Sequence, residues 1–140
     1  MNQQLIDNKC DCSYIIDTIK KIDKMQKDII SDTTYSCVSC ETSLISNLYN
    51  TIPISLYTCC SASPITAQIG TTDTTTTYFR VESIRCDKYV TLRLLELEGE
   101  EAPVLVGTDF TIIVDLSCIG SIQCFRAINV EVCTSSVANT

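Results

Sequence analysis

Ten cysteines are the residues of this 140-residue chain best suited to chemistry. They are Cys10, Cys12, Cys37, Cys40, Cys59, Cys60, Cys86, Cys118, Cys124 and Cys133. The chain has no histidine, so a nucleophile activated by an imidazole base is impossible. The thiols are therefore expected to bind metal, to exchange electrons or to form disulfides.

Metal binding is the first alternative to test against the spacing of these thiols. Cys37-Val38-Ser39-Cys40 has the two-residue gap with which two thiolates grip one zinc ion, and Cys10-Asp11-Cys12 or Cys59-Cys60 would complete four sulfur ligands. A second such pair with a two-residue gap is missing from the sequence. As a thioredoxin-type redox centre, the Cys37/Cys40 pair lacks the expected strand–helix setting. We expect no bound metal and no cofactor, with a zinc-binding module and a monomeric redox protein as the rivals.

Carboxylates offer a second kind of candidate site. Glu96, Glu98, Glu100 and Glu101 could supply paired catalytic carboxylates or calcium ligands. They are more simply explained as a solvated turn that keeps a sheet edge from aggregating. Four glycines are too few and too scattered for a phosphate-binding loop. We expect that the protein is not an enzyme and has no catalytic residues.

The surroundings of the cysteines predict two groups of thiols. Cys10 and Cys12 lie in a polar arm, Cys86 in a hairpin turn and Cys133 beside a polar tail. Exposed thiols are a liability unless they pair between molecules. If Cys59 and Cys60 are in a strand, one faces the core and the other faces solvent or a neighbour.

The best candidates for links between molecules are therefore Cys10, Cys12, Cys86 and one of Cys59 or Cys60. Cys124 is predicted to be a core residue on the apolar face of its strand. Cys118 and Cys124 are the better candidates for stabilising the fold or an immediate neighbour contact. The disulfide connectivity itself does not follow from the sequence.

Charge and composition narrow the possible partners and the compartment. The net charge of −7 and the pI near 4.4 argue against nucleic acid and against an anionic membrane surface. No apolar run is long enough to span a bilayer, and the first twelve residues lack the pattern of a signal peptide. We expect synthesis in a reducing cytoplasm, followed by later oxidation of the thiols.

The periodicity of apolar residues predicts one mainly β domain over residues 13–133, between an arm (1–12) and a polar tail (134–140). An amphipathic helix is expected over residues 13–30, ended by Ser31-Asp32-Thr33-Thr34. Six or seven short strands should then form a small antiparallel β-sandwich or barrel-like domain.

The strands are predicted from alternation of apolar and polar residues. Residues 52–57 form a strand whose Pro53 favours a sheet edge, and residues 71–77 form a solvated strand or its lead-in. Residues 79–84 and 90–94 make a hairpin around Cys86, with a bulge at Leu95-Glu96-Leu97. After a turn at 98–103, further strands are expected at 104–106, 110–116 and 122–132.

Three pieces of the chain resemble the family of spore coat proteins CotY and CotZ and the exosporium protein ExsY. They are Phe79-Arg80-Val81-Glu82, the turn cysteine Cys86 followed by residues 90–95, and the run from Ile113-Val114-Asp115-Leu116-Ser117-Cys118 to Ile122-Gln123-Cys124-Phe125. Residues 13–60 resemble the family more loosely. The family usually carries a further cysteine between the positions of Cys118 and Cys124, where this chain has Gly120.

This resemblance implies a structural protein made in the mother cell without a signal peptide. It implies self-assembly into a ring, two-dimensional lattice or fibre, locked by disulfides in the outer layer of a bacterial spore, either coat or exosporium. The expected partners are copies of the same chain and other spore coat proteins. A subunit of a cross-linked spore-surface fibre is the alternative within this class.

Overall fold

A long helix precedes the β-domain. The computed structural model describes residues 13–35 and 49–131. Helix α2 (Ser13–Tyr35) begins where the sequence predicted, but it continues past Ile30 to Tyr35. The predicted stop at Ser31–Thr34 was wrong because serine, aspartate and threonine lower helix propensity only modestly, whereas glycine or proline would break the helix.

The amphipathic character of α2 is confirmed. Ile19 and Ile22 are buried in the hydrophobic core. On the solvent side, Lys24 pairs with Asp28 and Lys27 pairs with Asp23 at four-residue spacing. The Lys24–Asp28 pair is exposed, whereas the Asp23 side chain is only 15% exposed. Helix pairs at this spacing add only a few tenths of a kcal/mol each, so burial of the apolar face contributes most of the stability of the helix.

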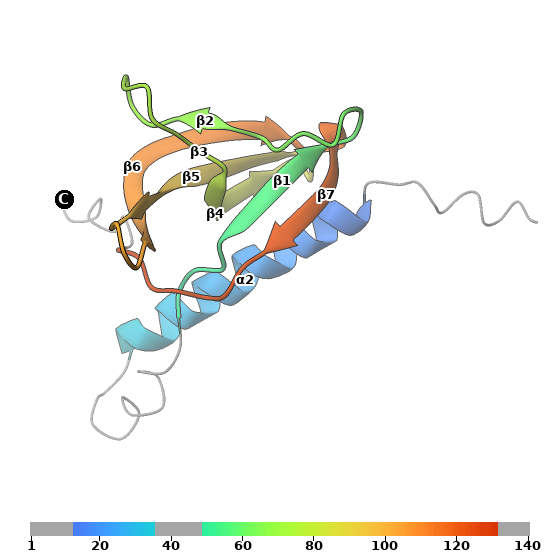
Figure 1. Ribbon diagram of the computed structural model, residues 1–140. Coiled ribbons are helices and arrows are strands. Elements are labelled where there is room, and N and C mark those ends of the chain that lie inside the picture. The colour runs from blue at the N-terminus through green and yellow to red at the C-terminus, as the bar shows by residue number, and fades with distance from the viewer. Residues whose placement is uncertain (1–12, 36–48, 132–140) are drawn as a thin grey trace, which may run out of the picture.

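A five-stranded antiparallel sheet forms the body of the domain, in the order β6-β5-β4-β1-β7 (Figure 1). Its strands are β1 (Ile54–Thr58), β4 (Tyr78–Arg85), β5 (Tyr89–Glu98), β6 (Val104–Asp115) and β7 (Ile119–Cys124). Strands β2 (Ala67–Gln68) and β3 (Thr75–Thr76) form a separate two-stranded sheet. The prediction of a mainly β domain behind one N-terminal helix is confirmed, and the large sheet is not a closed barrel.

Strand β1 lies in the interior of the sheet, between β4 and β7. The edge position predicted from Pro53 was wrong. Pro53 stands just before the strand, and its carbonyl accepts a hydrogen bond from the Phe125 backbone N–H at 2.8 Å. Because proline lacks only an N–H donor, it is tolerated at the start of an interior strand.

The hairpin of β4 and β5 is confirmed, as is the irregularity near Leu95. The pairing of β5 with β6 shifts register between Arg93 and Leu95. The additional residues belong to the partner strand, since Arg93 pairs with Thr111 and Leu95 pairs with Gly107. The two predicted strands at 104–106 and 110–116 are thus one strand, β6, interrupted by a bulge.

The connection between β6 and β7 forces the sheet to curl. These strands are its two edges, yet the three residues of the 3₁₀ turn η1 (Leu116–Cys118) join them. Four interstrand steps of about 4.8 Å would hold the edges of a flat sheet about 19 Å apart. A 3₁₀ turn advances by about 2 Å per residue and cannot cover that distance. The edges therefore approach each other where β6 ends and β7 begins (Figure 1).

Strand β7 also differs from its predicted range. It starts at Ile119 and ends at Cys124, whereas alternation predicted residues 122–132. Beyond Phe125 the chain keeps one bridge, from Thr51 to Ile128, instead of a continuous ladder. Since β1 is only five residues long, it offers β7 few residues with which to pair.

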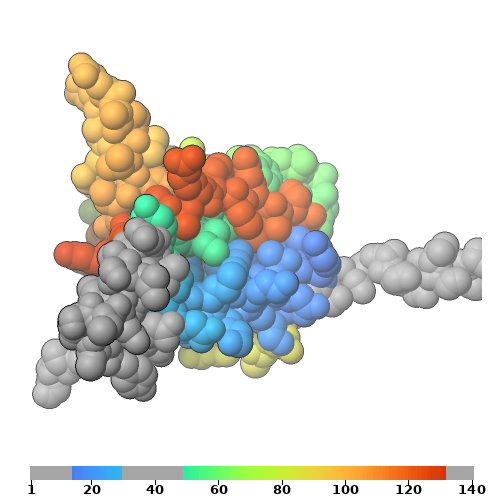
Figure 2. Space-filling model, turned by 90° about the horizontal axis from the view of Figure 1, so that it is seen from below, coloured from blue at the N-terminus to red at the C-terminus, as the bar shows by residue number. Residues whose placement is uncertain are grey.

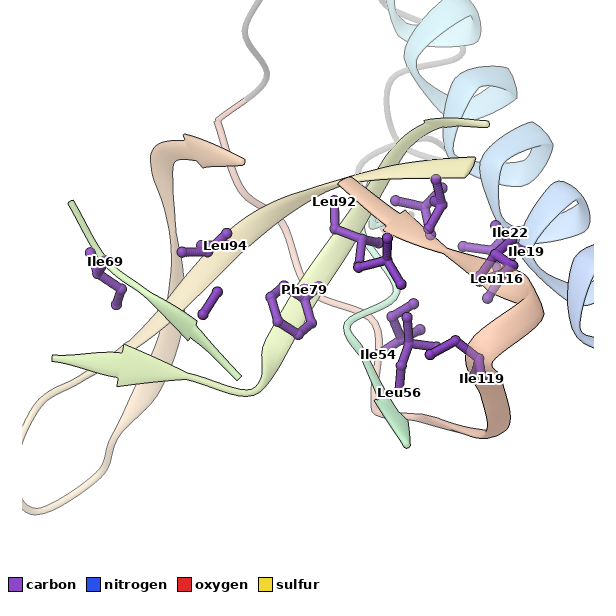
Figure 3. Packing of buried hydrophobic residues seen from close by; sticks show 14 residues of the cluster. Ile19, Ile22, Ile54, Leu56, Ile69, Phe79, Leu92, Leu94, Leu116 and Ile119 are labelled. Carbon is purple, nitrogen blue, oxygen red and sulfur yellow. The ribbon is translucent and has the colours of Figure 1, made fainter. Parts of the chain in front are cut away.

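One hydrophobic cluster unites the sheet with the elements that cover it (Figure 3). Phe79, Leu92 and Leu94 contribute from the sheet, and Ile19 and Ile22 from the helix. Ile69, beside β2, reaches the same cluster. Leu116 of η1 is fully buried and closes the end at which the sheet edges approach.

Candidate functional site: exposed thiols and an apolar groove

All five cysteines within the described residues are exposed, free thiols. They are Cys59, Cys60, Cys86, Cys118 and Cys124. The remaining candidates, Cys10, Cys12, Cys37, Cys40 and Cys133, lie outside the described residues. An exposed thiol is accessible to oxidants and to a neighbouring molecule, so these five positions form the candidate site.

Cys59 and Cys60 lie in a turn that follows β1. The strand ends at Thr58, and a hydrogen bond of 3.1 Å from the Ala62 N–H to the Thr58 carbonyl closes the turn. The prediction that one of the two thiols faces the core was wrong, because it required both residues to be in a strand. Both are exposed.

Cys118 comes close to Cys59 across the β1–β7 pair. The Cys59 backbone N–H donates to the Cys118 carbonyl at 3.0 Å. The register of the pair shifts between Tyr57 and Thr58, and Gly120 is the residue left over on β7. A Cβ at Gly120 would lie 3.0 Å from the Cys59 Cα, a backbone atom that cannot easily yield. Glycine therefore favours the close approach of these two segments, because any side chain here would push the Cys59 backbone away by a few tenths of an ångström.

Cys86 occupies a strained position in the β4–β5 turn. Cys86 and Asp87 have φ angles of 56° and 51°, and Lys88 N–H donates to the Arg85 carbonyl at 3.0 Å. Positive φ at both central residues is the geometry of a type I′ turn, which favours asparagine, aspartate and glycine. The turn is held against the helix by an ion pair between Asp87 and Lys20 at 3.1 Å. Cys86 is thus an exposed thiol at the end of this hairpin.

Cys124 is exposed at the end of β7, so the prediction of a core residue was wrong. It pairs with the fully buried Ile54. However, β7 is an edge strand, and among the described residues no further strand covers it. Partial burial still raises the pKa of the Cys124 thiol above its ordinary value by desolvating the thiolate.

The turn that carries Cys118 is fixed by Asp115. The Asp115 carboxylate accepts hydrogen bonds from the Ser117 backbone N–H at 2.9 Å and from the Ser117 hydroxyl at 2.7 Å. These hydrogen bonds, the backbone one foremost, lower the pKa of Asp115. Asp115 is thus the N-cap of η1 and positions the crossover between the sheet edges.

Two buried arginines were missed by the sequence analysis. Arg80 and Arg93 are directly paired across β4 and β5, and each is 4% exposed. Glu82 lies 2.9 Å from Arg80 and 3.9 Å from Arg93 and so offsets the repulsion between the two guanidinium groups. The signal was available in the pair of arginines at matching positions of the predicted hairpin.

Arg80 also anchors the segment that follows β7. Its guanidinium donates to the Thr51 hydroxyl at 2.7 Å and to the Asn50 carbonyl at 3.0 Å. The Asn50 side chain in turn exchanges hydrogen bonds with the backbone of Val130, at 2.8 and 3.0 Å. The chain around Val130 is therefore fastened to the sheet through a buried charge.

An apolar groove runs between this anchored segment and the end of the β5–β6 hairpin. We call residues 96–106 the β5–β6 arm, because pairing of β5 with β4 ends at Leu95. The arm stands out from the rest of the surface (Figure 2, gold). The groove is lined by Tyr49, Leu97, Pro103, Val104, Leu105, Val106, Phe125, Arg126, Ala127, Ile128 and Asn129.

Large apolar side chains are exposed at this groove. Leu97 is 50% exposed, Val104 58% and Tyr49 49%. Of the four glutamates predicted to form a solvated turn, Glu98, Glu100 and Glu101 are exposed towards the tip of the arm, whereas Glu96 is half-buried within β5. Sequence reasoning missed the groove because its two walls are distant in the chain.

The described residues contain no group of three or more cysteine, aspartate or glutamate side chains placed to hold one metal ion. The Cys37/Cys40 pair proposed for zinc lies outside them. Among the described helices, none is both long and apolar enough to cross a membrane.

The family model for spore coat protein Z matches residues 1–103. This range contains seven of the ten cysteines (Cys10, Cys12, Cys37, Cys40, Cys59, Cys60 and Cys86) and two of the three pieces on which the resemblance was based, but not the third, from Ile113 to Phe125. Neither the curated proteins nor the solved structures gave a significant match. The matched range covers most of the chain, and the protein therefore belongs to the spore coat protein Z family, whose members have a structural role in the spore coat.

Proposed function

We propose that this protein is a self-assembling structural subunit whose exposed thiols cross-link neighbouring copies in the outer layer of the spore. The observation that carries the proposal is the exposure of all five cysteines in the described part of a spore coat protein. A protein that kept its thiols for packing would bury them, since free cysteine is among the most buried residue types.

The positions of the exposed thiols suit links between molecules. Cys86 stands at a hairpin end, Cys124 at the end of an edge strand, and Cys60 in an exposed turn. Cys60 and Cys124 lie at opposite ends of the β1–β7 ladder, since Cys60 follows the end of β1 and Cys124 pairs with Ile54 at its start, so one copy can join more than one neighbour. A subunit with several links can build a ring, a two-dimensional lattice or a fibre.

Noncovalent contacts are needed to bring the thiols together before oxidation. The apolar groove beside the β5–β6 arm is the best candidate surface for such contacts with a second copy. Exposed apolar patches of this kind mark association sites. The acidic tip of the arm would keep separate copies soluble until the groove is filled, because like charges repel.

Disulfides would then make the assembly persistent. Within a chain each closed loop adds roughly 2–4 kcal/mol, but between chains the larger effect is kinetic, because dissociation then requires reduction. We propose that assembly occurs in the mother cell and that oxidation follows when the layer is exposed. Copies of the chain and other coat proteins are the proposed partners, in either coat or exosporium.

Electrophoresis and electron microscopy of the full chain test this proposal. The protein is purified in reductant, one half is exposed to air, and both halves are run on reducing and non-reducing gels. We expect a ladder of high molecular weight after oxidation that collapses with reductant, and regular assemblies by negative stain. A single monomer band in both halves, with no particles larger than a monomer, would sink the proposal.

The zinc-binding and redox alternatives give different results in the same samples. A zinc module would retain metal after dialysis and would lose its fold with a chelator. A monomeric redox protein would form a reversible internal disulfide without any large assembly. Metal analysis and thermal unfolding with and without chelator, alongside the gels, separate the three.

A further inference from the structure

The backbones of two exposed cysteines, Cys59 and Cys118, meet at the end of the β1–β7 ladder. Between Ile54 and Tyr57 the pairs run Ile54 with Cys124 to Tyr57 with Ser121. After the shift, Thr58 pairs with Ile119. The ladder ends there, because Cys59 lies in the turn after β1 and Cys118 is the last residue of η1. The hydrogen bond from the Cys59 N–H to the Cys118 carbonyl at 3.0 Å continues the same register for the two backbones.

The bulge at Gly120 is what brings these two backbones together. Without the extra residue, the earlier register would set Cys59 opposite Ile119 and leave Cys118 one position further along. Bulges re-aim side chains in this way, often at functional positions. Gly120 suits this bulge, because a Cβ at this position would lie only 3.0 Å from the Cys59 Cα.

The spacing of such a pair suits a disulfide. Residues that face each other across an antiparallel ladder have Cα atoms about 5.5 Å apart where they are hydrogen-bonded and about 4.5 Å where they are not. Both values lie within the range of about 4.4–6.8 Å that disulfides span. Cys59 and Cys118 are both exposed, so an oxidant can reach them.

We propose that Cys59 and Cys118 form a disulfide within one chain. This inference deepens the proposed function, because it divides the exposed thiols into one internal pair and a remainder. It rests on the proposed function for the time at which the bond forms, namely when the spore layer becomes oxidised. Cys60, Cys86 and Cys124 are then left to join neighbouring copies.

The bond forms by two thiol–disulfide exchanges with a low-molecular-weight disulfide as the oxidant. The thiolate of one cysteine attacks the small disulfide, forms a mixed disulfide and releases one small thiolate. The thiolate of the other cysteine then attacks the first cysteine's own sulfur in the mixed disulfide, which closes the internal bond and releases the second small thiolate. The two protein thiols lose two protons and two electrons, and the small disulfide is reduced to two thiols.

This bond would fasten the crossover between the sheet edges. Cys118 is the last residue of η1, which joins β6 to β7, and Cys59 follows β1. The bond closes a loop of about 60 residues, for which chain-entropy arguments give a substantial stabilisation. Oxidised monomers should therefore unfold at a higher temperature than reduced ones.

The test treats the full chain with oxidised glutathione at low protein concentration and isolates the monomer by gel filtration. Peptide mapping by mass spectrometry without reduction should find Cys59 linked to Cys118. Cys60→Ser is the matched control, since Cys60 is the exposed neighbour of Cys59 in the same turn. Its oxidised monomer should keep the link and gain on the order of 10 °C in Tm over its reduced form. Cys118→Ser should lose most of that gain.

Recovery of Cys59 and Cys118 as separately alkylated peptides from the oxidised monomer would overturn the inference, as would a Cys59–Cys60 or Cys60–Cys118 link in their place. These results are read from the monomer. Failure of the proposed function is read from the absence of covalent multimers in concentrated, oxidised protein. The two failures are therefore distinguishable.

Discussion

At the scale of single residues, Cys86 combines an unfavourable backbone conformation, which lowers stability, with an exposed thiol that is proposed to link copies. Cys86 has a φ of 56°, a conformation that is unfavourable for most residues with a β-carbon and is tolerated best by glycine and asparagine. We predict that Cys86→Asn raises the free energy of unfolding by about 0.5–1 kcal/mol, because asparagine tolerates the left-handed region. Thermal or denaturant unfolding in reductant measures this change.

Cys86→Ala is the control for that substitution. Alanine removes the thiol but keeps the β-carbon and the unfavourable φ, so it should give no such gain. If asparagine and alanine change stability equally, the explanation from the turn conformation fails. Both variants should form fewer covalent multimers than the wild type if Cys86 joins neighbouring copies.

The thiol of Cys124 should react with an unusual dependence on pH. Its raised pKa means that a smaller fraction is thiolate at pH 7, so alkylation by iodoacetamide should be slower than for the cysteine of a short unstructured peptide with blocked ends in the same buffer. The difference should shrink as the pH rises above the raised pKa. Peptide-resolved mass spectrometry of alkylation rates across pH checks this, and an identical pH profile for both thiols would contradict it.

At the scale of elements, Gln26 joins the helix to the sheet. Its side chain is 2% exposed, donates to the Val81 carbonyl at 2.8 Å and accepts from the Ile52 backbone N–H at 3.0 Å. Val81 borders a bulge in the β4–β5 pairing, where the register shifts before Ser83. The Gln26 side chain thus supplies hydrogen-bond partners to the Val81 carbonyl and the Ile52 N–H.

We predict that Gln26→Leu lowers the free energy of unfolding by about 2–3 kcal/mol, since it leaves both backbone groups without a partner. Lys24→Ala is the matched control on the exposed side of the same helix, where loss of the Lys24–Asp28 pair should cost no more than about 0.5 kcal/mol. Denaturant unfolding of the two variants measures the difference. Equal losses would contradict the role given to Gln26.

Asp115 should stabilise the crossover in a manner that depends on pH. Its pKa in the folded protein is lowered, chiefly by the Ser117 backbone N–H, so the stabilisation is present above the unfolded pKa of about 4 and is lost as pH falls through the folded pKa. We predict that Asp115→Ala lowers Tm at neutral pH and that its difference from wild type fades in acid. Asp109→Ala, an exposed carboxylate elsewhere on β6, should show no such pattern.

Most of the helix and strand positions could be predicted from the sequence, whereas the order of the strands in the sheet could not. The alternation in residues 79–84 and 90–94 depends only on nearby residues, and the hairpin was predicted correctly. Insertion of β1 between β4 and β7 depends on pairing with residues far away in the chain. For the same reason the sequence could place Cys124 on an apolar face but could not show that β7 is an edge.

At the scale of the whole molecule, the apolar groove should govern association more than folding. Leu97 lies on the β5–β6 arm and is half exposed, so its loss removes little from the core. We predict that Leu97→Gln weakens assembly in reductant, with Tm nearly unchanged. Analytical ultracentrifugation and negative-stain microscopy measure the assemblies.

Met25→Gln is the control for this substitution, because Met25 is an apolar residue of similar exposure, 41%, on the helix. It should leave assembly intact. An equal loss of assembly in both variants would show that general surface hydrophobicity, and not the groove, drives association. Full assembly of Leu97→Gln would remove the groove from the proposed function.

The short ladder between β1 and β7 has a mechanical consequence. Cys60 lies just beyond the end of β1, whereas Cys124 pairs with Ile54 at its beginning. Tension applied between these two sulfur atoms would pull along the strand axis. The hydrogen bonds of the ladder would then share the load in shear instead of opening one after another. A shell tied together at these two points could swell or bend without unravelling the domains from which it is made.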